Sequence, residues 1–216
     1  AIHWLVKEGD VLQPNQILCK ITGNARTVLT AERSALNFLQ LLSAVATKTH
    51  QFVKAIEDTH TVIVDTRKTL PGLRYAQKYA VRCGGGTNHR VGLYDGILIK
   101  ENHIIASGSI EKALNKARMI ASKSTMIEIE VETLDEMRQA LHSGATMILL
   151  DNFELDTLHK AVVLNRQYAQ PAILEASGNI TLINVRSVAE AGVDRISIGG
   201  LTKNIKAIDL SMRFLH

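Results

Sequence analysis

The stretch MIEIEVETLDEMRQALHSGATMILLD, residues 126–151, decides the fold. Two runs rich in aliphatic residues, MIEIEVE and TMILLD, flank a segment with helical periodicity, so the pattern predicts strand, helix, strand. Thr133 and Glu136 have capping-box spacing at the start of the helix, and Gly144 lies just past its end. The run MILLD is apolar without alternation, as in a strand covered on both faces of a parallel sheet. The sequence therefore predicts a parallel β-α-β unit.

The same unit repeats on both sides of this stretch. Six β segments alternate with five helical segments. The β segments are 61–67, 96–102, 126–132, 146–152, 172–178 and 195–200, and the helical segments are 73–83, 110–122, 134–144, 155–169 and 182–192. Five parallel crossovers without a dinucleotide-binding fingerprint favour an α/β barrel, closed or partly open, over a doubly wound sheet.

The first 60 residues have a different pattern. Residues 1–28 show strand-like alternation broken by turn signals such as Pro14-Asn15, which predicts a small β module. From Thr30 to Glu57 apolar residues recur at helical spacing, which predicts one long helix or a bent pair.

Composition indicates a soluble protein with an aliphatic core. The chain has 216 residues, 46% of them hydrophobic and only 4% aromatic, and no apolar run has the length of about 18 residues that a membrane span needs. Cys19 and Cys83 lack disulfide or metal-site spacing, so we expect a cytoplasmic, reducing setting. The chain starts at Ala1 without a signal peptide, and we expect that N-terminal residues are missing.

Positive charge is concentrated in one interval. Residues 67–103 hold seven Lys or Arg and two acidic residues, a balance of +5, whereas the formal charge of the whole chain is +4. The cationic and titratable side chains of interest there are Arg67, Lys68, His89, Arg90, Lys100 and His103. A local cluster favours a small anionic ligand, and the low aromatic content argues against nucleic-acid binding. Several guanidinium forks suit a dicarboxylate better than a monocarboxylate.

Polar residues follow the β segments, where a barrel carries its active site. We expect one rim to gather Asp65, Thr66, Arg67, Lys68, Lys100, Glu101, Asn102, His103, Glu128, Glu130, Asp151, Asn152, Glu175, Ser177, Gly178, Asn179, Ser197, Gly199 and Gly200. The turns ASGN and SIGG suit a phosphate monoester, to which Lys203 could add a charge. The carboxylates of Glu130 and Asp151 could hold Mg²⁺, bind ribose hydroxyls, stabilise a cationic transition state, or only pair with nearby cations.

The segment DTRKTLPGLRYAQKYAVRCGGGTNHRVGLYDGILIKENH, residues 65–103, closely resembles the quinolinate phosphoribosyltransferase family. AERSALNFLQ, EIEVE, LLDN, EASGN and SIGGLTK agree with it, so the likeness covers essentially the whole chain. The family joins an α/β sandwich domain to an incomplete, open-faced α/β barrel. The resemblance implies that residues 1–35 are a remnant of the sandwich, that 36–204 form the barrel, and that 205–216 pack back on the remnant.

The resemblance also implies an activity. The family transfers the phosphoribosyl group of phosphoribosyl pyrophosphate to quinolinate with decarboxylation, which gives nicotinate mononucleotide, CO₂ and pyrophosphate for NAD biosynthesis. Mg²⁺ is the implied cofactor, and Glu130 and Asp151 would face it and the ribose. A homodimer is the implied working unit, with Arg33 donated from the neighbouring subunit.

Site residues carry over by their matching motifs. Quinolinate would be held by Arg67, Lys68, His89, Arg90 and Lys100. The 5′-phosphate would be held by Ser177, Gly178, Asn179, Gly199, Gly200 and Lys203. Thr66 and Ile198 would complete the substrate-binding set. The catalytic residues would be Lys68, Lys100, Glu130 and Asp151. Many members have His where this chain has Lys203, a cation that can still meet a phosphate.

Two rival interpretations remain. A related transferase would act on nicotinate, which has one carboxylate, and would release no CO₂. Residues 5–21 resemble the hairpin of a biotinyl or lipoyl carrier domain, but this hairpin lacks an exposed Lys between two Met residues.

Overall fold

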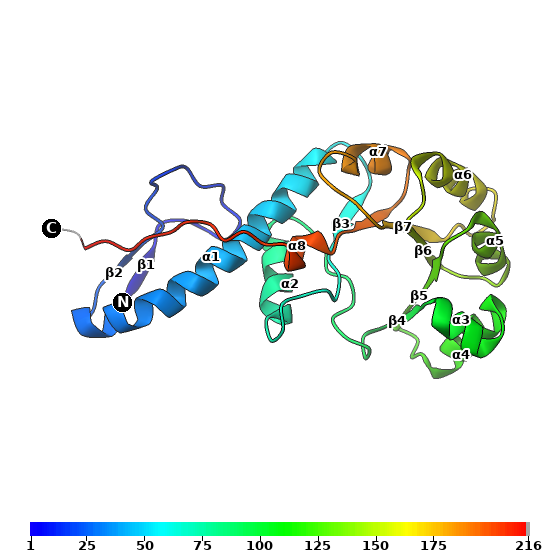
Figure 1. Cartoon of the computed structure of the whole chain (residues 1–216), viewed down its shortest axis with the longest axis horizontal. Coiled ribbons are helices and arrows are strands. Elements are labelled where there is room, and N and C mark those ends of the chain that lie inside the picture. The colour runs from blue at the N-terminus through cyan, green and yellow to red at the C-terminus, as the bar shows by residue number, and fades with distance from the viewer. Residues whose placement is uncertain (215–216) are drawn as a thin grey trace.

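The computed structural model describes residues 1–214, which form a six-stranded sheet with flanking helices and a separate two-stranded sheet (Figure 1). The strands are β1 (Ile2–Trp4), β2 (Cys19–Ile21), β3 (Val62–Val64), β4 (Gly96–Ile99), β5 (Met126–Val131), β6 (Met147–Asp151), β7 (Ile173–Ser177) and β8 (Arg195–Ser197). The helices are α1 (Ala25–Ala55), α2 (Arg74–Cys83), α3 (Glu101–Ser107), α4 (Ile110–Ile120), α5 (Leu134–His142), α6 (Leu155–Asn165), α7 (Val185–Glu190) and α8 (Gly200–Lys203). Within residues 1–214, no helix combines the length and apolar character needed to cross a membrane.

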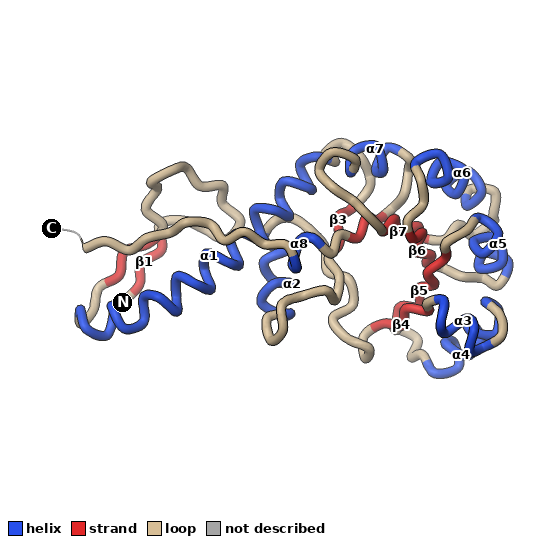
Figure 2. Tube along the Cα trace, viewed as in Figure 1, coloured by secondary structure: helices blue, strands red, loops and turns tan. Residues whose placement is uncertain are grey.

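The large sheet is parallel throughout. Its strand order is β3-β8-β7-β6-β5-β4, so β3 and β4 form its edges. The strands follow an arc with the helices outside it (Figure 2). Asp151 is opposite Ser177, and Ser177 is opposite Ser197, so the carboxyl ends of neighbouring strands are level. The predicted parallel α/β architecture is confirmed.

Burial and capping agree with the local sequence signals. Four successive residues of β6, 147–150, are buried, as expected for a strand covered on both faces. The backbone N–H of Glu136 donates to Thr133 Oγ1 at 3.2 Å, and the N–H of Thr133 donates to Glu136 Oε2 at 3.2 Å, which confirms the capping box. Gly144 has a φ of 72°, the left-handed conformation that ends α5.

The N-terminal part contains a β hairpin and one long helix. β1 and β2 pair antiparallel, which confirms the β module. Of the two alternatives for the following segment, one long helix is confirmed, because α1 runs unbroken for 31 residues. It begins earlier than predicted, since Asn24 Oδ1 accepts from the N–H of Thr27 at 3.3 Å and caps it. Residues 25–28 therefore belong to α1 and not to the β module.

The segment after β4 was predicted incorrectly. The sequence pattern extends the strand to residue 102, but β4 ends at Ile99 and α3 begins at Glu101. The ring Nδ1 of His103 accepts from the N–H of Lys100 at 3.0 Å, which satisfies a donor at the start of this helix. Gly108, with a φ of 87°, ends it after only seven residues. So short a helix has too few turns to show a periodic signal.

The C-terminal segment runs along α1 (Figure 1). The N–H of Ile208 donates to Gln40 O at 3.2 Å, and Gln40 Nε2 donates to Leu210 O at 3.2 Å. These hydrogen bonds hold the C-terminal segment against α1, and Figure 1 shows the segment continuing toward the β1–β2 hairpin. Residues 215 and 216 of the segment predicted to pack back lie outside the described residues.

Close packing of α1 against α2 depends on Gly84. A Cβ atom there would lie 2.3 Å from Ala46 O and 2.7 Å from Thr49 Cβ. We expect Gly84→Ala to lower the free energy of unfolding by about 2 kcal/mol, because two packed backbones must separate to admit the methyl group. Urea denaturation measures the change.

Gly23→Ala is the matched control, because its Cβ would meet nothing closer than Val28 Cγ2 at 3.4 Å. Equal stability of Gly84→Ala and Gly23→Ala would contradict the packing argument.

Candidate active site at the carboxyl ends of the strands

Lys100 and Glu130 meet at the carboxyl ends of β4 and β5. Lys100 Nζ lies 2.5 Å from Glu130 Oε2, and the Lys100 side chain is 47% exposed, so the pair is accessible to a ligand. Glu130 and Lys100 were both predicted site residues, and the parallel pairing of their strands brings them together.

The loops after β6 and β7 are joined through Asn152. Asn152 Nδ2 donates to Asp151 Oδ2 at 2.8 Å, and Asn179 Nδ2 donates to Asn152 Oδ1 at 3.4 Å. Gly178 has a φ of 103°, and a Cβ there would lie 2.1 Å from Asn152 Oδ1. Only glycine allows this approach. Asn152 was expected at the rim but not among the binding residues, and its bridging role depends on a contact between two loops.

Lysines converge on Gly199 and Gly200 after β8. A Cβ at Gly199 would lie 3.2 Å from Lys68 Cδ, 3.5 Å from Thr66 Oγ1 and 3.8 Å from Lys203 Cε. A Cβ at Gly200 would lie 3.9 Å from Lys48 Nζ. Several cations thus surround these two glycines, as the sequence predicted for Lys203, whereas it assigned Lys68 to the carboxylates of quinolinate.

Lys48 was not predicted. It lies on α1, and its Nζ donates to Asn204 O at 2.8 Å. Partial burial lowers the pKa of Lys48. Its spacing on α1 resembles that of any helix lysine, so no sequence signal distinguishes it.

Arg90 is buried beside β4. Its Nη1 donates to Gly96 O at 2.9 Å, and a Cβ at Gly96 would lie 3.2 Å from Arg90 Cβ, so the glycine allows the side chain to lie against the strand. Burial lowers the pKa of Arg90, and the nearby positive charge of Arg67 lowers it further. Two guanidinium groups held near each other are stabilised by an anion that binds both.

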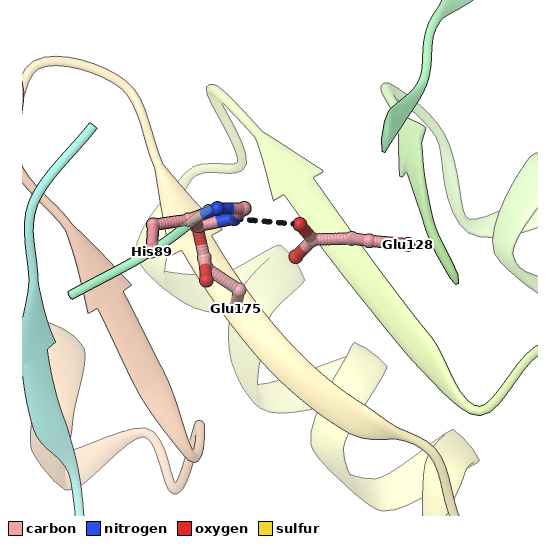
Figure 3. Close-up of side chains that lie close together, drawn as sticks. All are labelled: His89, Glu128 and Glu175. Carbon is pink, nitrogen blue, oxygen red and sulfur yellow. Dashed lines mark hydrogen bonds and ion pairs between the residues drawn. The ribbon is translucent and has the colours of Figure 1, made fainter. Parts of the chain in front are cut away.

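His89 meets two buried glutamates under the site. Its Nε2 lies 2.8 Å from Glu128 Oε2 and 3.7 Å from Glu175 Oε1 (Figure 3). Arg195 Nε lies 3.1 Å from Glu175 Oε2. Burial, followed by the charge of Glu128, raises the pKa of Glu175 to about 7.

The expectation that Glu128 and Glu175 lie at the rim is wrong. Both are fully buried. Alternate residues of a strand share a face, so Glu128 lies on the face of Glu130, and Glu175 on the face of Ser177, but each is two residues further from the strand end. They therefore lie beneath the rim.

Asp65 was also expected at the rim and is instead buried. Its carboxylate pairs with Lys78 Nζ and accepts from Asn88 Nδ2 at 2.6 Å and from the N–H of His89 at 2.9 Å. Burial raises the pKa of Asp65, and the Lys78 ammonium opposes that shift. Asp65 thus holds the loop that carries His89 and Arg90, and no ligand can reach it.

Arg33 lies apart from the other predicted site residues. It is exposed on α1, 15 residues before Lys48. At 1.5 Å per residue, the two positions are about 22 Å apart along the helix axis. Figure 1 shows the first half of α1 extending away from the large sheet.

Comparison with known proteins identifies the family. The quinolinate phosphoribosyl transferase C-terminal domain matches residues 45–213, and the N-terminal domain of the same family matches residues 1–43. The chain belongs to the quinolinate phosphoribosyl transferase family. The sequence resemblance is thereby confirmed.

Individual members of the quinolinate phosphoribosyl transferase family are similar over nearly the whole chain. A probable nicotinate-nucleotide pyrophosphorylase (carboxylating) of Bacillus subtilis is 46% identical over 208 residues, which cover 95% of this chain and 70% of that protein. A quinolinate phosphoribosyltransferase (decarboxylating) of Nicotiana glauca is 37% identical over 231 residues, which cover 98% of this chain and 64% of that protein. The structure of the nicotinate-nucleotide pyrophosphorylase from Francisella tularensis matches with a TM-score of 0.93 and 48% identity, over 98% of this chain and 74% of that one.

Proposed function

We propose that this chain transfers the phosphoribosyl group of phosphoribosyl pyrophosphate to quinolinate with decarboxylation, forming nicotinate mononucleotide, CO₂ and pyrophosphate in NAD biosynthesis. The observation that carries the proposal is that cations and carboxylates lie together at the carboxyl ends of the strands in a member of this family. The cations would bind the carboxylates of quinolinate, and the carboxylates and glycines would bind the ribose and phosphate of phosphoribosyl pyrophosphate.

Quinolinate would bind at the part of the site that contains Arg67 and Arg90. Arg67 and Arg90 would hold its two carboxylates, since guanidinium forks bind carboxylates bidentately. Arg90 has one nitrogen bound to Gly96 O, so its remaining N–H groups are available in a fixed direction. Lys68 and Lys100 would complete the charge balance.

The phosphoribosyl donor would bind along β5 to β8. Glu130 and Asp151 would face the ribose, and the amides around Gly178 and Gly199 would hold the 5′-phosphate with Lys203. The last residue of β7, Ser177, and Asn179 flank Gly178, and Ile198 and the first residue of α8, Gly200, flank Gly199. The hydroxyl of Thr66 lies near Gly199, so Thr66 would also contribute to the binding of the phosphoribosyl donor.

Glu130 and Asp151 also fit Mg²⁺. They offer carboxylate oxygens, and Mg²⁺ is commonly bound by one or two carboxylates together with substrate phosphates. One oxygen of each is engaged, Glu130 Oε2 by Lys100 and Asp151 Oδ2 by Asn152, which leaves the second oxygen of each as a candidate ligand. When bound, the ion would neutralise charge on the pyrophosphate.

The reaction would need little proton transfer by the protein. The pyridine nitrogen forms a bond to ribose C1 as the bond from C1 to pyrophosphate breaks, and positive charge develops on the ribose near Glu130 and Asp151. When the 2-carboxylate leaves as CO₂, the electron pair of the broken bond stays on ring C2, where the adjacent pyridinium nitrogen stabilises it, and a proton from solvent then bonds to C2. Lys68 and Lys100 would stabilise the negative charge of the departing pyrophosphate.

A homodimer would complete the site. Arg33 is too far along α1 to reach the strand ends of its own subunit, which supports its donation to a neighbouring one. We also propose that the curved sheet is an open-faced barrel of residues 36–204, with residues 1–35 as the remnant of a sandwich domain. The free cysteines Cys19 and Cys83 fit a cytoplasmic setting.

Product formation tests the proposal. With quinolinate, phosphoribosyl pyrophosphate and Mg²⁺, we expect nicotinate mononucleotide and CO₂ in equal amounts, and loss of both products when the ion is chelated. Nicotinate in place of quinolinate is the control, because one carboxylate engages fewer of the cations. Faster turnover of nicotinate without CO₂ would favour the rival transferase.

A further inference from the structure

A buried hydrogen-bond chain connects β5 to Arg90. The backbone N–H of Arg90 lies 2.7 Å from Nδ1 of the His89 ring. Figure 3 shows the other contact of the ring, in which Nε2 lies 2.8 Å from Oε2 of Glu128. The His89 side chain is only 6% exposed and that of Glu128 is fully buried. Protein atoms therefore engage both ring nitrogens.

These partners determine the tautomer of His89. A backbone N–H can only donate, so Nδ1 must be the unprotonated, accepting nitrogen. The ring proton then lies on Nε2 and is donated to the Glu128 carboxylate. An imidazolium would place a second N–H against that of Arg90, so the arrangement requires a neutral ring.

Glu175 belongs to the same buried cluster but is not a hydrogen-bond partner of His89. Glu175 lies near the ring but at 3.7 Å, beyond hydrogen-bond distance, and its other oxygen is paired with Arg195. Because the pKa of Glu175 is raised to about 7, chiefly by burial, this group holds a proton below neutral pH.

We propose that Glu128 is a positioning residue of the quinolinate-binding site, which acts through His89 on Arg90. The inference rests on the proposed function. Glu128 orients the ring, the ring fixes the backbone of Arg90, and Gly96 O holds the other end of the side chain. The direction of the remaining guanidinium N–H groups is thereby set before substrate binds.

Substitution of Glu128 tests the route. We expect Glu128→Ala to raise KM for quinolinate about tenfold, the effect of losing one hydrogen bond to a charged group. KM for phosphoribosyl pyrophosphate should stay within about twofold, because its proposed contacts lie elsewhere. Glu128→Gln should restore most of the affinity for quinolinate, since its amide oxygen can accept from Nε2.

Glu175→Ala is the matched control. It removes an equally buried carboxylate from the same cluster, but one that makes no hydrogen bond to His89. We expect its KM for quinolinate to stay within about threefold of wild type. Equal increases for Glu128→Ala and Glu175→Ala, or an increase in both substrate KM values, would overturn the proposal.

The tautomer of His89 can be measured spectroscopically in the wild-type protein, without an activity assay. In ¹⁵N spectra of histidine-labelled wild-type protein, His89 should show an unprotonated Nδ1 and a protonated Nε2. A protonated Nδ1 would overturn the proposal. If the wild-type protein formed no nicotinate mononucleotide in the assay, that result would count against the proposed function, and this spectroscopic test would still apply.

Discussion

Lys100→Ala is expected to lower kcat for nicotinate mononucleotide formation at least about a hundredfold, the loss typical of removing a positioned donor that stabilises transition-state charge. Lys100 is the cation that meets Glu130 across β4 and β5, at 2.5 Å. Its loss would remove a positive charge from the proposed site and would leave the Glu130 carboxylate without this partner. Steady-state kinetics with both substrates measure the change.

The side chain of Lys100 is 47% exposed, so its truncation should leave the fold intact, and an unchanged unfolding transition would verify this. Lys116→Ala, at an exposed position on α4, is the control and should behave as wild type. Activity of Lys100→Ala within about threefold of wild type would remove Lys100 from the mechanism.

Protein stability is expected to fall as Glu175 ionises. Its pKa is raised from 4.5 to about 7, chiefly by burial, so the folded state holds this proton more tightly than the unfolded state does. The stabilisation from the bound proton is fully present below pH 4.5 and is lost as pH rises through about 7. The shift corresponds to about 3 kcal/mol across this window.

Comparison of wild type with Glu175→Gln isolates this contribution, because a glutamine amide resembles the protonated carboxyl and does not titrate. The free energy of unfolding from urea titrations should favour the variant increasingly between pH 5 and pH 8. Glu132→Gln, at an exposed position, should follow wild type at every pH. Parallel curves for wild type and Glu175→Gln would show that Glu175 is already ionised in the folded protein.

Local sequence signals predicted most of the fold. The six parallel strands, the capping box of Thr133 and Glu136 and the end of α5 at Gly144 all appear where the sequence indicates them. Apolar periodicity and capping depend on contacts within a few residues, so they can be read along the chain. The interval 67–103 likewise revealed its excess of positive charge by composition alone.

The depth of each polar residue was decided by the tertiary structure. Glu128 and Glu130 are equivalent in the pattern of β5, yet one is buried against His89 and the other meets Lys100 at the strand end. Lys48 reaches Gly200 only because α1 packs beside α8. These outcomes depend on strand register and helix placement between segments far apart in the chain. The sequence by itself therefore determined which chemical groups the strand ends carry, and only the folded structure decided which of them face a ligand, because burial arises from packing between distant elements.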